Sequence, residues 1–103
     1  MSAPRLHQVS LADLQDSTRL LRLYEQAVQR HLIGPSEAER LSFVALAQHV
    51  LAYRPANPGG LFVQLLRQRR FVVITQDEED RAQQRLKRHW YEPDWARLRQ
   101  ATG

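Results

Sequence analysis

Apolar residues in the first third of the chain recur at the spacing of one helical face. Between positions 11 and 32 they fall on every fourth residue, at Leu20, Tyr24, Val28 and Leu32. This period places the four side chains in one stripe along an α-helix. Ser10 is suited to cap the start of such a helix, and Gly34 followed by Pro35 is typical of a helix end. The pattern therefore predicts one continuous helix over 11–32.

The second segment begins with a capping box formed by Ser36 and Glu39, whose side chains each bind a backbone N–H of the other. The widest apolar face of the chain follows it, at Phe43, Leu46, Ala47, Val50 and Leu51. We expect a helix over 36–53 that is the most buried element of the fold. It should end before Pro55, because the residue preceding a proline is disfavoured in the helical region.

A third helix is predicted over 57–70, where Asn57 is a good N-cap and Pro58 suits the first helical position. Its apolar face is formed by Leu61, Phe62, Leu65 and Leu66. Gly59 and Gly60 are unusual in a first turn, because each glycine costs about 1 kcal/mol relative to alanine. They indicate a close approach of the backbone to a phosphate, close packing of this turn against another helix, or a loosely wound first turn.

The last third of the chain contains a run of strand-forming residues and then a strong helix signal. Residues 71–75 have high β propensity. A strand needs a partner, and the sequence offers only 6–9, so the run predicts either a short β element or an extended apolar connector. Thr75 and Glu78 then form another capping box. The apolar stripe at Ala82, Leu86 and Trp90 continues this helix towards Pro93, and Asp94 is suited to cap a final short turn.

Together these segments predict a single, mainly α-helical domain over 1–103, since about 100 residues is an ordinary domain length. Four helices make a small four-helix domain, and the arrangement becomes winged-helix-like if the short β element near 71–75 is present. Residues 1–9 carry no helical pattern, and we expect them to be a flexible or extended N-terminus.

Composition and charge limit the cellular compartment and the kinds of binding partner that we expect for this chain. The chain has no cysteine, a net charge of +4, and one lysine among fifteen basic residues. The planar guanidinium of arginine binds phosphate better than the ammonium group of lysine does. A GC-rich genome also favours arginine codons, so the abundance of arginine over lysine has two explanations. The charge permits a polyanionic partner without requiring one. We expect a cytoplasmic protein with no membrane partner, because the chain carries no secretory signal and no run of about 20 apolar residues.

No arrangement of residues predicts catalysis or a bound cofactor. The histidines at positions 7, 31, 49 and 89 lack metal-ligand spacing, and the acidic run at 77–80 is typical of a first helical turn. We therefore expect no catalytic residue, no metal and no cofactor, and hence a protein that is not an enzyme. An enzyme would need a cleft that brings His49 or His31 next to a carboxylate.

Two groups of three arginines are the candidate nucleic-acid-binding residues. They are Arg67, Arg69 and Arg70 at the end of the third helix, and Arg81, Arg85 and Arg88 on the last helix. The second group shares one stripe, together with Gln84, because its members are three or four residues apart. Such rows suit phosphate contacts or the reading of bases. The alternative is a solvated face on which Arg81 and Arg85 pair with Asp77 or Glu78.

Aromatic residues concentrate near the end of the chain, at Trp90, Tyr91 and Trp95. Large aromatic side chains are common at the centre of protein interfaces, so these three are the candidate partner-binding residues. The alternative is that they close a small core.

The stretch Asn-Pro-Gly-Gly-Leu-Phe-Val-Gln-Leu-Leu at 57–66, continued by 71–87, resembles DnaD-like domains and plasmid replication initiators. The resemblance covers about thirty residues and implies a DNA-associated or replisome-associated accessory module of bacterial mobile DNA, with 57–70 at its contact surface. The chain departs from the pattern at Leu61-Phe62, where those domains often have Tyr-Leu. It also lacks the large catalytic or ATPase domain of such systems.

The leading hypothesis is a small, non-enzymatic DNA-binding or replication-associated accessory protein that contacts phosphates through its arginines. The rival hypothesis is a helical protein–protein adaptor or a homodimer with no nucleic-acid role. The rival depends on the aromatic group at the end of the chain and on apolar helix faces, with Phe43, Leu46, Val50, Phe62 and Leu66 as their main residues.

Overall fold

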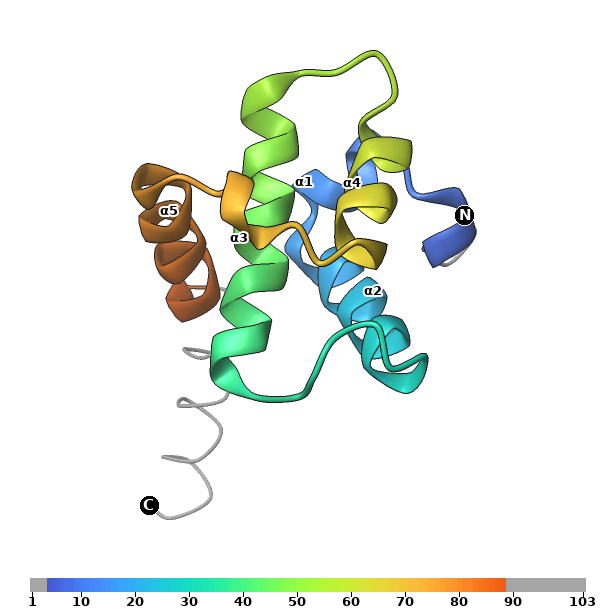
Figure 1. Ribbon diagram of the computed structural model, residues 1–103, viewed down its shortest axis with the longest axis horizontal. Helices are drawn as coiled ribbons and strands as arrows, with labels where there is room; N and C mark the ends of the chain where they lie inside the picture. The colour runs from blue at the N-terminus through green and yellow to red at the C-terminus, as the bar shows by residue number, and fades with distance from the viewer. Residues whose placement is uncertain (1–3, 89–103) are drawn as a thin grey trace.

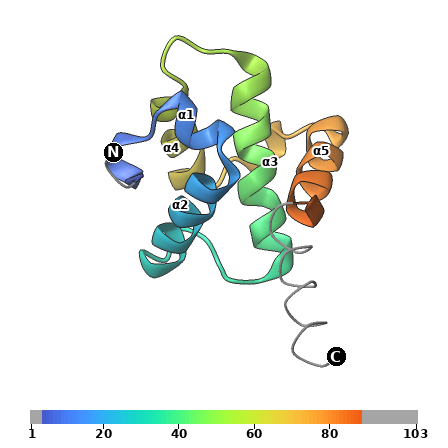
Figure 2. The ribbon, with the colours of Figure 1, turned by 180° about the vertical axis from the view of Figure 1, so that it is seen from behind.

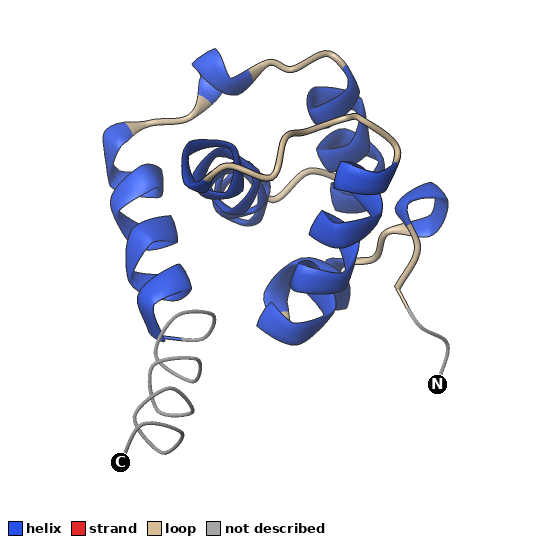
Figure 3. Cartoon of the chain, turned by 90° about the horizontal axis from the view of Figure 1, so that it is seen from below, coloured by secondary structure: helices blue, strands red, loops and turns tan. Residues whose placement is uncertain are grey.

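The fold is built from α-helices joined by short connections, as the computed structural model shows for residues 4–88 (Figure 1). In chain order the elements are the 3-10 helix η1 (Leu6–Gln8), α1 (Leu11–Gln15), α2 (Ser17–Gln29), α3 (Glu37–Tyr53), α4 (Pro58–Arg67), the 3-10 helix η2 (Phe71–Val73) and α5 (Gln76–Leu86). The prediction of a mainly α-helical protein is confirmed. The view in Figure 3 contains no strand in this part of the chain.

Helix α3 is the centre of the domain, and the other helices are arranged around it. Helix α5 packs along one side of α3, and α1, α2 and α4 lie on the other side (Figures 1 and 2). The expectation that this helix is the most buried element is confirmed by its fully covered residues, which are Phe43, Val44, Ala45, Leu46, Ala47 and Val50. Because α3 has neighbours on both sides, apolar residues occupy most of its circumference.

Three aromatic rings pack together where α3 meets α2 and α4. The Phe43 ring meets Tyr24 of α2 at a centroid distance of 5.3 Å and Phe62 of α4 at 5.2 Å, both edge to face. This geometry aligns the positive edge of one ring with the negative face of the next. Phe43 and Phe62 have no exposed surface, so this trio is the centre of the core.

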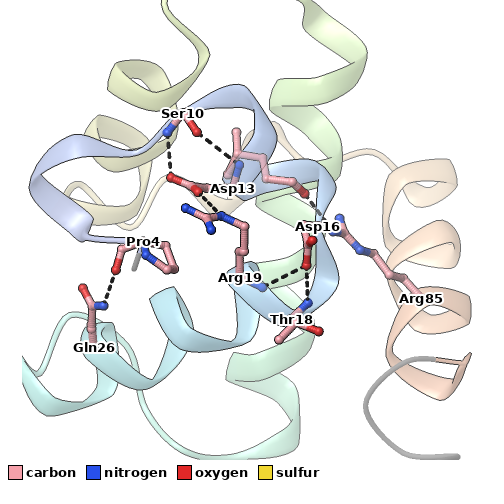
Figure 4. Close-up of polar contacts among 9 residues, drawn as sticks. Pro4, Ser10, Asp13, Asp16, Thr18, Arg19, Gln26 and Arg85 are labelled. Atoms are coloured by element: carbon pink, nitrogen blue, oxygen red, sulfur yellow. Dashed lines mark hydrogen bonds and ion pairs between the residues drawn. The ribbon is translucent and has the colours of Figure 1, made fainter. Parts of the chain in front are cut away.

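The helix expected over 11–32 is in fact two helices that meet at Asp16 (Figure 4). Asp16 has extended backbone angles, and its carboxylate accepts the N–H groups of Thr18 at 2.9 Å and Arg19 at 3.1 Å. It is therefore the N-cap of α2, a role that aspartate favours over a helix interior. Helix α1 has its own capping box, formed by Ser10 and Asp13.

The end of α2 also differs from the prediction. His31, rather than Gly34, takes the left-handed conformation after the helix, with φ of 59°. The helix consequently ends at Gln29, three residues earlier than the apolar stripe indicates. Leu32 accordingly lies outside the helix.

The N-terminal residues that the structure describes are folded onto the domain, where a flexible or extended segment was expected. Leu6 begins η1 and is only 1% exposed. Gln26 of α2 holds this segment from both directions, because its side chain accepts the N–H of Leu6 at 3.1 Å and donates to the carbonyl of Pro4 at 2.7 Å. The Pro4–Gln26 contact is drawn in Figure 4.

The predicted β element at 71–75 is wrong, because this segment contains the 3-10 helix η2. Its only candidate partner, 6–9, is occupied by η1, and strand propensity alone does not make a strand. Phe71, Val73 and Ile74 pack against the core while Val72 is 87% exposed. The segment is thus an apolar connector that crosses α3 on its way to α5.

The other predicted helix starts are confirmed by their caps. At α3 only half of the predicted capping box is present, because Ser36 Oγ accepts the Glu39 N–H at 3.2 Å while the Glu39 carboxylate accepts from Arg69. Asn57 caps α4 through the N–H of Gly60, and Thr75 and Glu78 form the capping box of α5. Ala82 and Leu86 face the core as expected, whereas Trp90, Tyr91, Trp95 and the turn after Asp94 lie outside the described residues. Between residues 4 and 88, no helix has the length and apolar character needed to cross a membrane.

Candidate nucleic-acid interface

The two arginine groups lie on different sides of the domain. Arg67 ends α4 and is followed by Arg69 and Arg70, whereas Arg81 and Arg85 lie on α5 and Arg88 comes two residues after its end. Helices α4 and α5 flank α3 from opposite sides in Figures 1 and 2. The two groups therefore form separate surfaces. Each must be judged by the contacts of its own side chains.

Within the first group, Arg67 and Arg70 are exposed, while Arg69 is used by the fold. Arg69 has a left-handed backbone with φ of 51°. Its guanidinium donates to the Leu32 carbonyl at 3.1 Å and to Glu39 at 2.8 Å, and it lies 5.3 Å from the centre of the Phe71 ring. Arg67 and Arg70 have no hydrogen bond or ion pair from their side chains to residues 4–88. Arg69 thus joins the end of α4 to the loop before α3. The guanidinium groups of Arg67 and Arg70 remain exposed to solvent.

Within the second group, the i, i+4, i+7 spacing brings the side chains together as expected. Arg81, Gln84, Arg85 and Arg88 line a shallow hollow of about 220 Å³ on α5. The predicted pairing of Arg81 with Asp77 is present at 3.1 Å, with both side chains largely exposed. Such a surface pair contributes little energy, so Arg81 can exchange Asp77 for another anion.

Arg85 is the exception in this group, because its guanidinium is directed inward (Figure 4). It donates to Ser17 Oγ at 2.8 Å, to Gln48 Oε1 at 2.9 Å, and to the carbonyls of Leu14 and Gln15 at 2.8 and 3.0 Å. Burial lowers the pKa of Arg85, and nearby Asp16 offsets part of this effect. Arg85 therefore ties α5 to α3 and to the junction of α1 and α2, which corrects the expectation that it faces solvent or a phosphate.

A cavity of about 650 Å³ lies between η1 and α4, beside Arg67. Its polar lining consists of His7, Gln8, Asn57, Gln64, Arg67 and Gln68, and the rest of its lining of Leu6, Val9, Gly59, Gly60 and Val63. None of the lining residues within 4–88 is a carboxylate. Sequence reasoning missed this feature, although Gln64 precedes Arg67 by three residues and Gln68 by four, the spacings at which side chains along a helix are neighbours. His7 and Gln8 reach it only through the folding of η1.

The glycine pair at the start of α4 is explained by close packing. A Cβ atom at Gly59 would overlap the carbonyl oxygen of Val9, and one at Gly60 would lie 2.5 Å from the Asn57 side-chain nitrogen. The Gly60 N–H is already bound by Asn57 at 3.0 Å. Of the three alternatives for this pair, the contacts favour close packing, here against the backbone at Val9, over an open phosphate site or a loosely wound turn.

His49 does meet a carboxylate, as an enzyme would require, but the contact belongs to a helix cap. His49 Nδ1 lies 2.9 Å from Glu78 Oε1, and the same oxygen accepts the Thr75 N–H at 3.0 Å. Glu78 is 8% exposed. Across the described part of the chain, no three His, Asp or Glu side chains are grouped so that they could hold a metal ion. The His49–Glu78 pair fastens α5 to α3.

Two buried carboxyl groups make the stability of the domain depend on pH. Burial raises the pKa of Glu78, but hydrogen bonds from Thr75 and His49 outweigh this and hold it below its ordinary value. Burial likewise raises the pKa of Asp13, and bonds from Ser10 and from Arg19 at 2.6 Å outweigh it. A carboxyl with a lowered pKa in the folded state stabilises that state above its unfolded pKa. This stabilisation is lost as the pH falls through the folded pKa.

We therefore expect the midpoint of urea unfolding to fall as the pH is lowered from about 5 towards 3. The variant Glu78→Gln should be less stable than the parent at pH 7, and its stability should change less over the acidic range. The exposed Glu25 of α2 provides the matched control, since Glu25→Gln should retain the parent's pH dependence. Parallel pH profiles for Glu78→Gln and the parent would contradict the assigned role of Glu78.

A comparison of the chain with protein-family models, with curated proteins and with solved structures found no match. The resemblance of 57–66 to replication-associated domains consequently stays a prediction. Within residues 4–88, the exposed and unpaired Arg67 beside the cavity at α4, together with the exposed and unpaired Arg70, is the arrangement best suited to bind an anion.

Proposed function

We propose that this chain is a small, non-enzymatic DNA-binding protein that contacts phosphates through Arg67 and Arg70 at the end of α4. The supporting observation is that Arg67 and Arg70 have exposed guanidinium groups without ion pairs in residues 4–88, and that Arg67 lines a cavity in which none of the described lining residues is a carboxylate. The nearby carboxylate of Glu39 is occupied by Arg69. An incoming phosphate therefore meets unpaired positive charge. The planar guanidinium of arginine can bind such a phosphate through two parallel hydrogen bonds.

The arginines of α5 form a second and weaker part of this proposal. Arg81 and Arg88 are exposed and line the same hollow as Gln84. Asp77 and Glu79 precede them on the helix, and the carboxylate of Asp77 competes with a phosphate for Arg81. We therefore assign the main phosphate contacts to the α4 surface and not to α5.

The finer proposal, a replication-associated accessory role in bacterial mobile DNA, depends on the resemblance of 57–66. It is compatible with the placement of α4, because the residues that carry the resemblance include Gln64, which lines the cavity beside Arg67. In this role the domain would hold DNA while a separate protein performs the chemistry.

Fluorescence anisotropy of labelled DNA, repeated at several salt concentrations, tests the phosphate contacts. Each phosphate contact contributes about −0.9 to the slope of log K against log salt concentration for a duplex. The double variant Arg67→Ala/Arg70→Ala should therefore flatten the slope by about 2 and weaken binding at low salt. Arg69 is left unchanged, because its contacts with Glu39 and Leu32 make its loss a structural defect.

Two controls separate a specific surface from general attraction by net charge. Arg22→Ala removes one exposed charge from α2, and it should leave the slope nearly unchanged. Arg81→Ala/Arg88→Ala removes two charges from α5, and it should flatten the slope less than the α4 pair does. Equal effects of all these variants would contradict a binding surface at α4, and absence of binding at low salt would contradict the proposed function.

A second candidate function, a protein–protein adaptor or homodimer, is favoured by another part of the surface. A cavity of about 730 Å³ is lined mainly by apolar residues, including Leu11, Leu51, Pro55 and Pro58. Leu11 is 45% exposed, and Tyr53, in the same stretch of chain as Leu51, is 68% exposed. The apolar helix faces that the sequence predicts for this role cannot form an interface, because their main residues are buried in the core. These are Phe43, Leu46, Val50, Phe62 and Leu66. A dimer mass in solution without any DNA binding would favour this candidate.

A further inference from the structure

We infer that the cavity between η1 and α4 accommodates one unpaired nucleotide of a DNA single strand. This inference rests on the proposed function and makes it more specific, because it names the form of DNA that binds. It is carried by the shape of the site, the two kinds of side chain that line it and the position of Arg67.

The size and apolar lining of the cavity fit a nucleobase. Its volume of about 650 Å³ falls within the range of about 300–1,000 Å³ found for small-molecule sites. Val9 and Val63 are partly exposed and supply an apolar wall, on which the flat face of a base can lie. Gly59 is buried beneath this wall and lets the backbone of α4 approach the Val9 carbonyl, because a side chain there would overlap that oxygen.

The polar lining has hydrogen-bonding capacity that the fold does not use. The side chains of His7, Gln8, Gln64 and Gln68 make no hydrogen bond to the described residues. Glutamine carries both a donor and an acceptor, which matches the mixed edges of nucleobases. Arg67 is the positive charge of the cavity, and it suits the phosphate of the same nucleotide.

The concave shape favours an unpaired base over a duplex. In a duplex each base has its faces covered by its neighbours and its edge occupied by its partner, so it cannot enter a cavity without being extruded. In a single strand the base is free to leave the stack, and proteins bind it by its face and its edges together. The mixed lining beside Arg67 provides contacts of both kinds.

The experiment compares a 15-nucleotide single strand with the duplex of the same sequence, by anisotropy at several salt concentrations, and compares affinities at the lowest of them. The parent should bind the single strand more tightly. The variant Gln8→Ala/Gln64→Ala should lose about tenfold in affinity for the single strand, as expected for two net hydrogen bonds, and little for the duplex. Its salt slope should not change, because glutamine is uncharged. The exposed pair Gln29→Ala/Gln83→Ala, which lies outside the cavity, is the matched control.

Photocrosslinking provides a second measurement that does not depend on the substitutions. A strand with one 5-iodouracil should form crosslinks within 6–9 or 57–68. Equal affinity for single strand and duplex, with a slope still flattened by Arg67→Ala/Arg70→Ala, would overturn this inference and leave the proposed function standing. Crosslinks confined to other segments would also overturn it. Absence of binding to either DNA would remove the proposed function, and the inference with it.

Discussion

Replacing Phe43 with alanine is expected to lower the free energy of unfolding by about 4 kcal/mol, near the middle of the range for truncating a buried phenylalanine. Phe43 has no exposed surface, and its ring contacts both Tyr24 and Phe62 edge to face. The substitution therefore removes apolar burial and two ring contacts, and it leaves a cavity where α2, α3 and α4 meet. Urea unfolding followed by circular dichroism measures the loss.

A graded pair of variants keeps this prediction measurable. Since small domains have a total stability of about 5–15 kcal/mol, Phe43→Ala could unfold much of the population, and Phe43→Leu should retain enough stability for a full transition. Val72→Ala is the control, because Val72 is 87% exposed and its truncation should cost less than about 0.5 kcal/mol. A similar loss for Val72→Ala and Phe43→Ala would contradict the assignment of the core.

Replacing Arg85 with alanine is expected to destabilise the domain by about 3 kcal/mol, the upper end of the range for a hydrogen bond to a charged group. One guanidinium donates to Ser17, Gln48 and the carbonyls of Leu14 and Gln15. Its loss removes the Arg85 donor from all four of these groups. Lysine has one compact ammonium group in place of a planar fork, so Arg85→Lys should recover only a small part of the stability. Thermal or urea unfolding measures both.

Arg81 provides the matched control, because it lies one turn earlier on the same helix. Its ion pair with Asp77 is exposed, so Arg81→Ala should cost less than about 0.5 kcal/mol. If Arg85→Ala cost no more than Arg81→Ala, the inward contacts of Arg85 would not stabilise the fold. Under conditions in which it stays folded, Arg85→Ala should also preserve the salt dependence of DNA binding, which separates the structural arginine from the α4 surface.

Helix starts could be predicted from sequence where a short, local motif determines them. Ser36 begins α3, Asn57 begins α4 and Thr75 begins α5, each through bonds within four residues. The break at Asp16 was missed because the apolar period of 20–32 dominated the pattern. A signal was present, since Asp16-Ser17-Thr18 is a run of residues that favour helix caps over helix interiors.

Features that depend on distant residues could not be predicted in the same way. The run at 71–75 has strand propensity, but a strand depends on a partner that is not available here. The α5 stripe was placed correctly by its spacing, yet the direction of Arg85 depends on acceptors near positions 14–17 and at Gln48. The cavity beside Arg67 likewise requires η1, which carries no helical pattern. Local periodicity therefore predicted which arginines share a helical face, but it did not predict which groups their side chains contact.

The reach of Arg85 also determines how the domain can open. Its bonds to Ser17 and to the Leu14 carbonyl join residues that are 68 and 71 positions apart in the chain. A contact of this kind couples the last described helix to the first two, so α5 cannot detach without disturbing α1 and α2. Partial unfolding in proteins usually proceeds by release of contiguous units. We therefore expect α5 and the junction of α1 and α2 to belong to one such unit, so that their backbone amides exchange with solvent together.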